Sequence, residues 1–99
     1  RMGNSNPFVG QWTASDGLSN VVLVIEEVSD GYSVMVVDQS DSEEAEVYDV
    51  EFEEDVLSFK IHWESNGQFV KYQFRLLSDN TLGVTYTFSA QETWLKVEE

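Results

Sequence analysis

Hydrophobic and polar residues alternate with a period of two on both sides of a short polar stretch in the middle of the chain. Apolar side chains occupy every second position in residues 57–63 and again in residues 70–76, and the polar residues between them include Asn66-Gly67. Such alternation is typical of strands with one buried face, and Asn-Gly is a strong hairpin signal. The pattern therefore predicts a β-hairpin at the centre of the chain.

A two-residue turn at Asn66-Gly67 would set the pairing of the two arms. A slip of one residue would send the apolar set of one strand to solvent, so the alternation assigns each side chain to a face. The expected pairs are apolar on both sides: Trp63 with Val70, Ile61 with Tyr72, Phe59 with Phe74, and Leu57 with Leu76.

The same pattern predicts further strands on either side of this hairpin. Residues 8–14, 20–28, 32–38 and 45–52 precede it, and residues 81–88 and 92–97 follow it. The expected turns lie at Asp30-Gly31, at Glu54-Asp55, over residues 77–81, and at Ala90-Gln91. No segment carries an apolar repeat of 3.6 residues, so we expect essentially no helix.

These turns also set the expected registers of the outer hairpins. The turn at Glu54-Asp55 would place Phe52 opposite Leu57, although both turn residues must then adopt a positive φ. The longer turn after residue 76 would pair Leu76 with Leu82, Phe74 with Val84, Tyr72 with Tyr86, and Val70 with Phe88. The last turn would pair Phe88 with Thr93, Tyr86 with Leu95, and Val84 with Val97.

Eight strands joined end to end leave one unpaired edge at each end of the sheet. The first and the eighth strand can remove both edges by pairing with each other. The expected fold is therefore all-β, an eight-stranded antiparallel up-and-down meander barrel, with a two-sheet sandwich of the same strand order as the alternative. We expect residues 8–99 to form this single domain, after a disordered or vector-derived lead-in over residues 1–7.

Most aromatic side chains have the parity of the inner face. A barrel of eight strands is either filled by side chains or holds one small ligand. The tyrosine hydroxyls could orient the polar head of an apolar ligand, or could simply hydrogen-bond to neighbours in a solid core. The expected lining of such a site is Tyr32, Tyr48, Phe59, Trp63, Tyr72, Phe74, Tyr86 and Phe88.

A short motif near the start of the first strand adds a family resemblance. Gly10-Gln11-Trp12 resembles the Gly-x-Trp opening of the lipocalin, fatty-acid-binding and avidin superfamily. The resemblance implies a lipocalin-like barrel in which Gly10 and Trp12 form a plug at one end, with a small apolar ligand inside. The chain has no Arg near its last strand, where lipocalins place one against the Trp; Lys96 is the only base there.

The second and third strands are apolar on both faces. One set of these side chains must point outward, and exposed apolar patches on proteins often mark contacts. We expect Val22, Val24, Met35 and Val37 to form an interface, in a homodimer or with another partner. Under this alternative the barrel is a solid interaction or structural module, and coverage of the patch by the N-terminal arm is also open.

The charge of the chain limits its partners. Nineteen acidic and five basic residues give a net charge of −14, and no Lys or Arg lies between Met2 and Phe59. Nucleic acid is nearly excluded, because its phosphates need neutralising bases, and an anionic membrane surface would repel the chain. No apolar run approaches about 18 residues, so we expect no membrane insertion and leave the compartment open, cytoplasmic or exported.

Few residues could carry catalysis or bind a metal. The chain has no Cys, its single histidine is His62, and the parity of His62 is outward. Serines lack a base partner for a triad, and the acidic loop over residues 38–44 lacks the glycine of an EF-hand. We therefore expect no enzyme activity, no metal and no cofactor.

Overall fold

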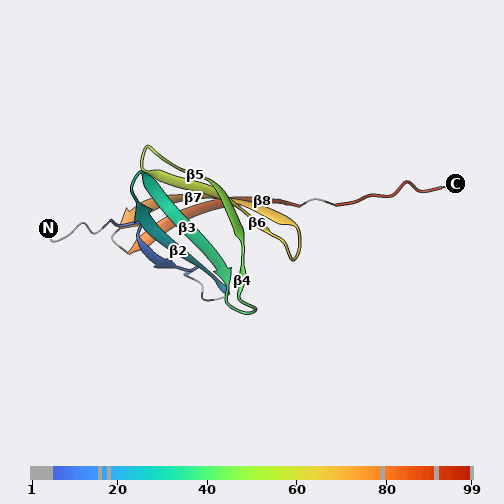
Figure 1. Ribbon diagram of the computed structural model, residues 1–99, viewed down its shortest axis with the longest axis horizontal. Coiled ribbons are helices and arrows are strands. Elements are labelled where there is room, and N and C mark those ends of the chain that lie inside the picture. Colours follow the sequence, from blue (N-terminus) through green and yellow to red (C-terminus); the bar gives the residue numbers. More distant parts are fainter. Residues whose placement is uncertain (1–5, 16, 18, 79, 91, 99) are drawn as a thin grey trace.

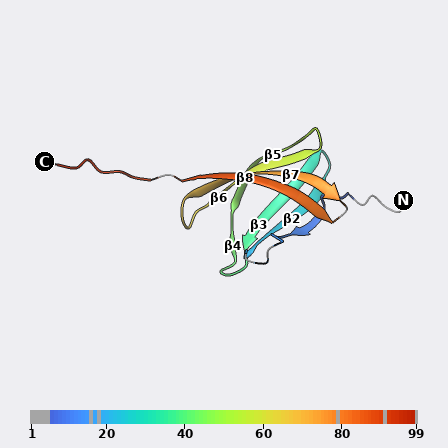
Figure 2. The same cartoon turned by 180° about the vertical axis from the view of Figure 1, so that it is seen from behind.

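The fold of the chain is two four-stranded antiparallel sheets that face each other. The computed structural model describes residues 6–15, 17, 19–78, 80–90 and 92–98. Within these residues it contains strands and no helix, which confirms the all-β antiparallel prediction (Figures 1 and 2). Sheet one consists of β1 (Gly10–Trp12), β2 (Val21–Val28), β3 (Gly31–Asp38) and β4 (Glu43–Glu44); sheet two consists of β5 (Glu46–Glu53), β6 (Val56–Trp63), β7 (Gln68–Ser78) and β8 (Thr81–Ala90).

A single residue joins the two sheets. Ala45 is buried between β4 and β5, and its N–H donates to the carbonyl of Val36 at 2.9 Å. The chain from β4 to β5 therefore passes continuously from sheet one to sheet two, as Figure 1 shows. In the described part of the chain β1 pairs only with β2, and β8 pairs only with β7, so the two sheets remain open on that side.

The core fills the space between the sheets. In β6 every second residue is buried and the residues between are half-buried, which confirms the alternation that predicted this strand. Removing these apolar side chains from water stabilises the fold by roughly 1.5–3 kcal/mol for each fully buried residue. The core consists of Phe8, Leu23, Ile25, Val36, Ala45, Leu57, Phe59, Ile61, Trp63, Val70 and Phe74.

The register predicted for the central hairpin is wrong by two residues. Ile61 lies opposite Val70, and the loop comprises the four residues 64–67 rather than a two-residue turn. Gly67 adopts a left-handed φ of 72°, and its N–H donates to the carbonyl of Trp63 at 2.8 Å. Asn66 contributes through its side chain, whose Oδ1 accepts the N–H of Gln68 at 3.0 Å. Because the shift is even, every side chain keeps its predicted face.

The turn between β2 and β3 shows a shift of the same size. Val28 lies opposite Gly31, so Ser29 and Asp30 form the two-residue turn instead of Asp30-Gly31. The even shift again leaves the faces unchanged, and Leu23 and Ile25 point into the core.

The registers of the two outer hairpins are correct close to their turns. Glu54 and Asp55 form the predicted turn, with positive φ angles of 54° and 67°, and Phe52 lies opposite Leu57. The longer turn leaves Leu77 as a bulge and produces all four predicted pairs: Leu76 with Leu82, Phe74 with Val84, Tyr72 with Tyr86, and Val70 with Phe88.

A bulge in β5 reverses the predicted face of Tyr48. The register changes between Tyr48 and Glu51, and Asp49 adopts a left-handed φ of 56°. Tyr48 consequently lies opposite Lys60 on the outer face, and Val47 takes the inner position opposite Ile61. A β-bulge inserts one extra residue and so exchanges the faces of everything beyond it.

The prediction of a strand over residues 92–97 is wrong. Residues 92–98 belong to no strand and extend away from both sheets, as Figures 1 and 2 show. Trp94, Leu95 and Val97 are 84%, 86% and 83% exposed. The structure has one strand that the sequence did not predict. It is the two-residue β4, in a segment that was expected to be an acidic loop.

Candidate functional site

The structure brings four of the predicted lining residues together on the inner face of sheet two. The ring centroid of Phe59 lies 5.3 Å from that of Tyr72 and 5.3 Å from that of Phe74, and Tyr72 lies 6.0 Å from Tyr86. Exposure increases from β6 towards β8: Phe59 is 1% exposed, whereas Tyr86 is 59% and Phe88 63% exposed. The cluster therefore runs from the packed core to the open side of sheet two.

Tyr72 is the titratable group most affected by this cluster. Burial of its hydroxyl raises the pKa of Tyr72, and the neighbouring Tyr86 raises it further because two phenolates would repel each other. The neutral hydroxyl of Tyr72 is therefore the form that the folded protein favours.

Tyr32 belongs to a different aromatic cluster, near the N-terminal end of the described chain. Its ring lies 5.8 Å from that of Phe8 and 5.2 Å from that of Phe52. Its hydroxyl donates to Oδ1 of Asn6 at 3.1 Å and accepts from Nδ2 of the same residue at 2.9 Å. Trp63 is 9% exposed and part of the core. The eight predicted lining residues therefore do not form a single site. Tyr72 and its neighbours lie in the cluster on sheet two, and Tyr32 lies in the second cluster. Trp63 belongs to the core, and Tyr48 lies on the outer face.

The Gly-x-Trp motif covers one part of the core. Trp12 is half-buried, packs against the core, and donates its Nε1–H to the carbonyl of Phe8 at 2.9 Å. Gly10 has a φ of 143°, which favours glycine, yet a Cβ built there would meet no atom within 4 Å. The backbone conformation, rather than a close neighbour, is therefore what favours a glycine at this position.

A pocket that the sequence did not predict lies on the outer face of sheet two. Its cavity volume is about 340 Å³. Tyr48 reaches it because of the bulge at Asp49, a signal that alternation alone does not contain. Both polar and apolar side chains line it: Tyr48, Lys60, Phe69, Val70, Lys71, Thr87, Phe88 and Ser89.

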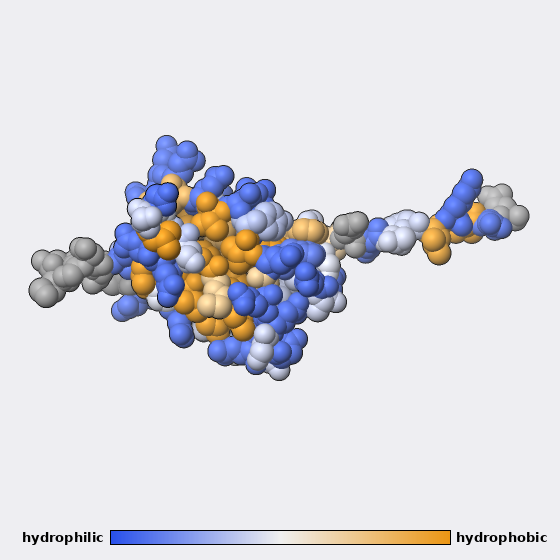
Figure 3. Space-filling model, in the orientation of Figure 1, coloured by the Kyte–Doolittle hydropathy of each residue, from blue (hydrophilic) through white to orange (hydrophobic). Residues whose placement is uncertain are grey.

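The predicted interface residues do share the outer face of sheet one. Val22 lies opposite Val37 and Val24 lies opposite Met35, so the four side chains form two adjacent cross-strand pairs. Met35 is 40% exposed and the three valines are half-buried. We call these four residues the outer patch. Figure 3 shows hydrophobic side chains gathered over β2 and β3 on this face.

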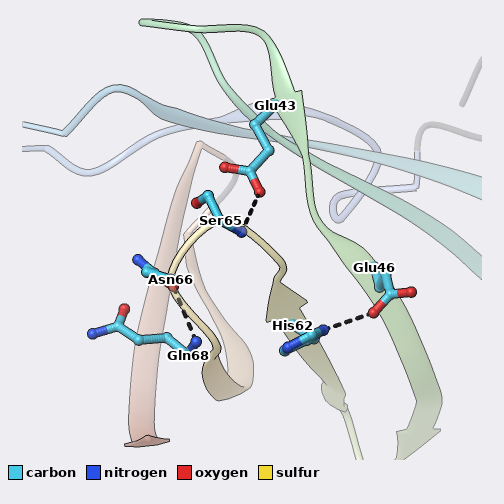
Figure 4. A network of polar contacts seen from close by, with 6 residues as sticks. All are labelled: Glu43, Glu46, His62, Ser65, Asn66 and Gln68. Atoms are coloured by element: carbon cyan, nitrogen blue, oxygen red, sulfur yellow. Dashed lines mark hydrogen bonds and ion pairs between the residues drawn. The ribbon is translucent and has the colours of Figure 1, made fainter.

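His62 takes part in polar contacts beside the loop of the central hairpin (Figure 4). Its Nδ1 lies 2.7 Å from Oε1 of Glu46, and its ring stacks on Phe69 with centroids 4.4 Å apart. Nearby, Oε2 of Glu43 accepts the N–H of Ser65 at 3.1 Å and so ties β4 to the hairpin loop. The contact between Glu43 and Ser65 positions the loop. His62 itself lies on the outer face that parity predicted, opposite Phe69.

Two features are not found among the residues that the structure describes: a cluster of metal-ligating side chains and a helix that could cross a membrane. No group of three or more His, Asp or Glu side chains there could hold a metal ion. The same part of the chain has no helix long and apolar enough to cross a membrane.

Comparison with protein-family models, with curated proteins and with solved structures finds no match for this chain. The class that the fold and its surfaces define is therefore an all-β protein of two antiparallel sheets with an apolar outer patch. Function has to be inferred from those surfaces.

Proposed function

We propose that this protein is an interaction module that binds another protein through the outer patch. The observation that carries the proposal is the cross-strand pairing of Val22 with Val37 and of Val24 with Met35 on the outer face of sheet one. The interior of the fold already has its own packed core, so these side chains contribute nothing to it. Contiguous apolar side chains on a solvent face are typical of contact sites.

The charge around the outer patch favours a basic partner. Glu26 follows Val24 on the same face of β2, and Glu44 lies opposite Val37, so carboxylates border the patch. With a net charge of −14, the chain attracts Lys and Arg over long range and repels acidic surfaces. The best-fitting partner is a protein with an apolar face bordered by Lys and Arg; the homodimer predicted from the sequence is the competing occupant.

A designed strand peptide that alternates Val with Lys tests this proposal. Binding should produce NMR shift changes at the outer patch and weaken as salt rises. Met35→Glu should reduce the affinity, because it places a charge among the apolar contacts. The matched control is Leu77→Glu, at a residue that is 65% exposed on sheet two. Equal binding by both variants would contradict the proposal, and a dimer abolished by Met35→Glu alone would identify a second copy as the occupant.

A second candidate function is the binding of a small apolar ligand in a lipocalin-like barrel. It is supported by the exposed Tyr86 and Phe88 beside Tyr72, on the side where the two sheets stay open. In this proposal the sheets close into the eight-stranded barrel, and the tyrosine hydroxyls hold the polar head of the ligand. Native mass spectrometry with fatty acids tests it: one ligand should bind, and Tyr86→Ala should weaken binding. Failure to retain any of a range of apolar molecules would exclude this function.

A further inference from the structure

The free edge of β8 lacks the protection that the other edges of the two sheets have. Native proteins blunt sheet edges with short strands, charged residues, proline or bulges, because the unpaired N–H and C=O groups otherwise recruit another strand. β1 and β4 are only three and two residues long, and β5 has four acidic residues and a bulge. β8 (Thr81–Ala90) has ten residues, none of them charged and none of them proline. It pairs with β7 on one side, and no described strand pairs with its other side.

The side chains of β8 that face sheet one are apolar and poorly covered. Val84, Tyr86 and Phe88 are 46%, 59% and 63% exposed. Phe74 and Val70, which lie opposite Val84 and Phe88 on β7, are buried. Residues 92–98 extend away from both sheets and do not cover the edge of β8 (Figure 2). The inner face of sheet two is therefore incomplete along this edge.

The strands nearest this edge carry no negative charge. β6, β7 and β8 contain Lys60, Lys71 and Arg75 and no acidic residue, whereas the other five strands contain nine acidic residues and no Lys or Arg. A contact through β8 would keep the acidic β5 of each copy at the far edge of its sheet. Repulsion between two chains of net charge −14 is therefore weaker for this contact than for one through β5.

The sequence of β8 is complementary to itself. β8 is in continuous register with β7 from Leu82 to Ala90, so it contains no bulge there. When such a strand pairs antiparallel with its own copy about a two-fold axis, the numbers of opposing residues sum to an even value and inner residues meet inner residues. The inner residues of β8 are all apolar and the outer ones are all uncharged: Leu82, Val84, Tyr86, Phe88 and Ala90 inside, and Thr81, Gly83, Thr85, Thr87 and Ser89 outside.

We infer that two copies of this chain pair antiparallel through their β8 edges, which joins their four-stranded second sheets into one sheet of eight strands. The register places Thr85 on the two-fold axis, opposite Thr85 of the second copy. Leu82 then lies opposite Phe88, and Val84 lies opposite Tyr86. Each pair occurs twice, as a closed dimer requires. Every aromatic ring has an aliphatic partner in this register, which is a favourable kind of cross-strand pair.

This dimer goes beyond the proposed function, because it uses the edge of sheet two and leaves the outer patch of sheet one free. Failure of one does not imply failure of the other. Closure of a barrel by pairing of β8 with β1 of the same chain competes for the same edge. That arrangement would leave the chain a monomer, so the mass in solution distinguishes the two.

Sedimentation equilibrium of the full chain gives the first test. The wild-type chain should have twice the mass of one chain. Thr85→Lys should raise the dissociation constant by about fivefold or more, because it sets two like charges directly opposite each other although it makes each chain less acidic. Two controls add the same charges elsewhere and should remain dimers: Met35→Lys on the outer patch, and Leu95→Lys with Val97→Lys beyond β8. A wild-type chain that stays monomeric at high concentration, or equal weakening by the controls, would overturn the inference.

A single introduced cysteine tests the register. The chain has no Cys, so introduced thiols can react only with each other. Opposing residues of an antiparallel pair have Cα atoms about 4.5–5.5 Å apart, which is within the range of a disulfide. Thr85→Cys should therefore form a disulfide-linked dimer under mild oxidation.

Ser89→Cys, on the same outer face of β8, is the matched control. Ser89 of one copy lies opposite Thr81 of the other, so two Ser89→Cys thiols would be about 27 Å apart and should stay unlinked. Disulfide linkage of both variants to the same extent, or of neither, would show that the two copies do not meet in this register and would overturn the inference.

Discussion

Lys60 on β6 lies directly opposite Lys71 on β7, with both side chains on the outer face of sheet two. The chain has only five basic residues, so this pairing of two of them is unexpected on composition. Asp49 offsets part of the repulsion, because its carboxylate lies 3.3 Å from Nζ of Lys60. The ammonium of Lys71 faces a like charge across the strands.

We predict that Lys71→Glu stabilises the fold. Opposite charges in a cross-strand pair contribute about 0.2–1 kcal/mol, whereas like charges destabilise. The free energy of unfolding from urea titration measures the gain, which should shrink as salt rises. Lys71→Gln is the matched control, since it removes the repulsion without adding an attraction, and it should give a smaller gain. A loss of stability in Lys71→Glu at low salt would show that the added negative charge of the whole chain outweighs the pair.

The turn between β5 and β6 should be open to improvement. Glu54 and Asp55 both adopt left-handed φ angles, of 54° and 67°. This conformation costs roughly 1–2 kcal/mol for an ordinary residue and little for Gly or Asn. Glu54→Asn with Asp55→Gly should therefore raise the free energy of unfolding by about 1–2 kcal/mol.

The reverse substitution at the central loop is the control for this turn. Gly67 has a φ of 72°, so Gly67→Ala should destabilise the protein although a Cβ there meets no atom within 4 Å. If both sets of variants left the stability unchanged, backbone strain would not contribute at these turns.

Truncation of Phe59 should be the most damaging change in the core. Phe59 is 1% exposed and contacts the rings of Tyr72 and Phe74. Phe59→Ala should lower the free energy of unfolding by about 3–5 kcal/mol, through lost burial and the cavity it leaves. Leu77→Ala, at a residue 65% exposed, should stay within about 0.5 kcal/mol of the wild type. Similar losses for the two variants would mean that the sheets do not pack as described.

Stability should fall in alkaline solution because of Tyr72. Burial raises the pKa of Tyr72 in the folded state above its ordinary value of 10.0. The unfolded chain therefore releases this proton more readily, so the contribution of Tyr72 to stability is complete below the ordinary pKa and is lost as pH rises through the folded pKa. Urea titrations between pH 8 and 11 should show this loss. Tyr72→Phe removes only the hydroxyl and should flatten the profile; an unchanged profile would assign the loss to other groups.

Alternation along the chain was sufficient to predict strands, their antiparallel order and most of their faces. Two hairpin registers were nevertheless wrong by two residues, at Asn66-Gly67 and at Asp30-Gly31. Turn residues such as Asn66 can act through the side chain as well as through the backbone, so the loop length stays ambiguous in the sequence. Such an error leaves each side chain on its predicted face, because every second side chain of a strand points to the same face.

The binding surfaces were predictable only in part. The shared face of the outer patch follows directly from parity, since Val22 lies opposite Val37 and Val24 lies opposite Met35. Its role as an interface stays a prediction. Tyr48 and the pocket on sheet two were missed, because one inserted residue at Asp49 exchanges faces without any change in hydrophobic pattern. The predicted lining failed as a single site, since Tyr32 and Tyr72 lie in separate clusters.

What the sequence by itself determined is the all-β class and the inner or outer face of nearly every strand residue, because both depend on a local period of two. Only the tertiary structure decided how the strands divide into two sheets, where the bulge lies, and that residues 92–98 leave the fold. The division and the path of that segment depend on contacts between residues far apart in the chain. Such contacts depend on the packing of whole sheets rather than on any neighbouring residue.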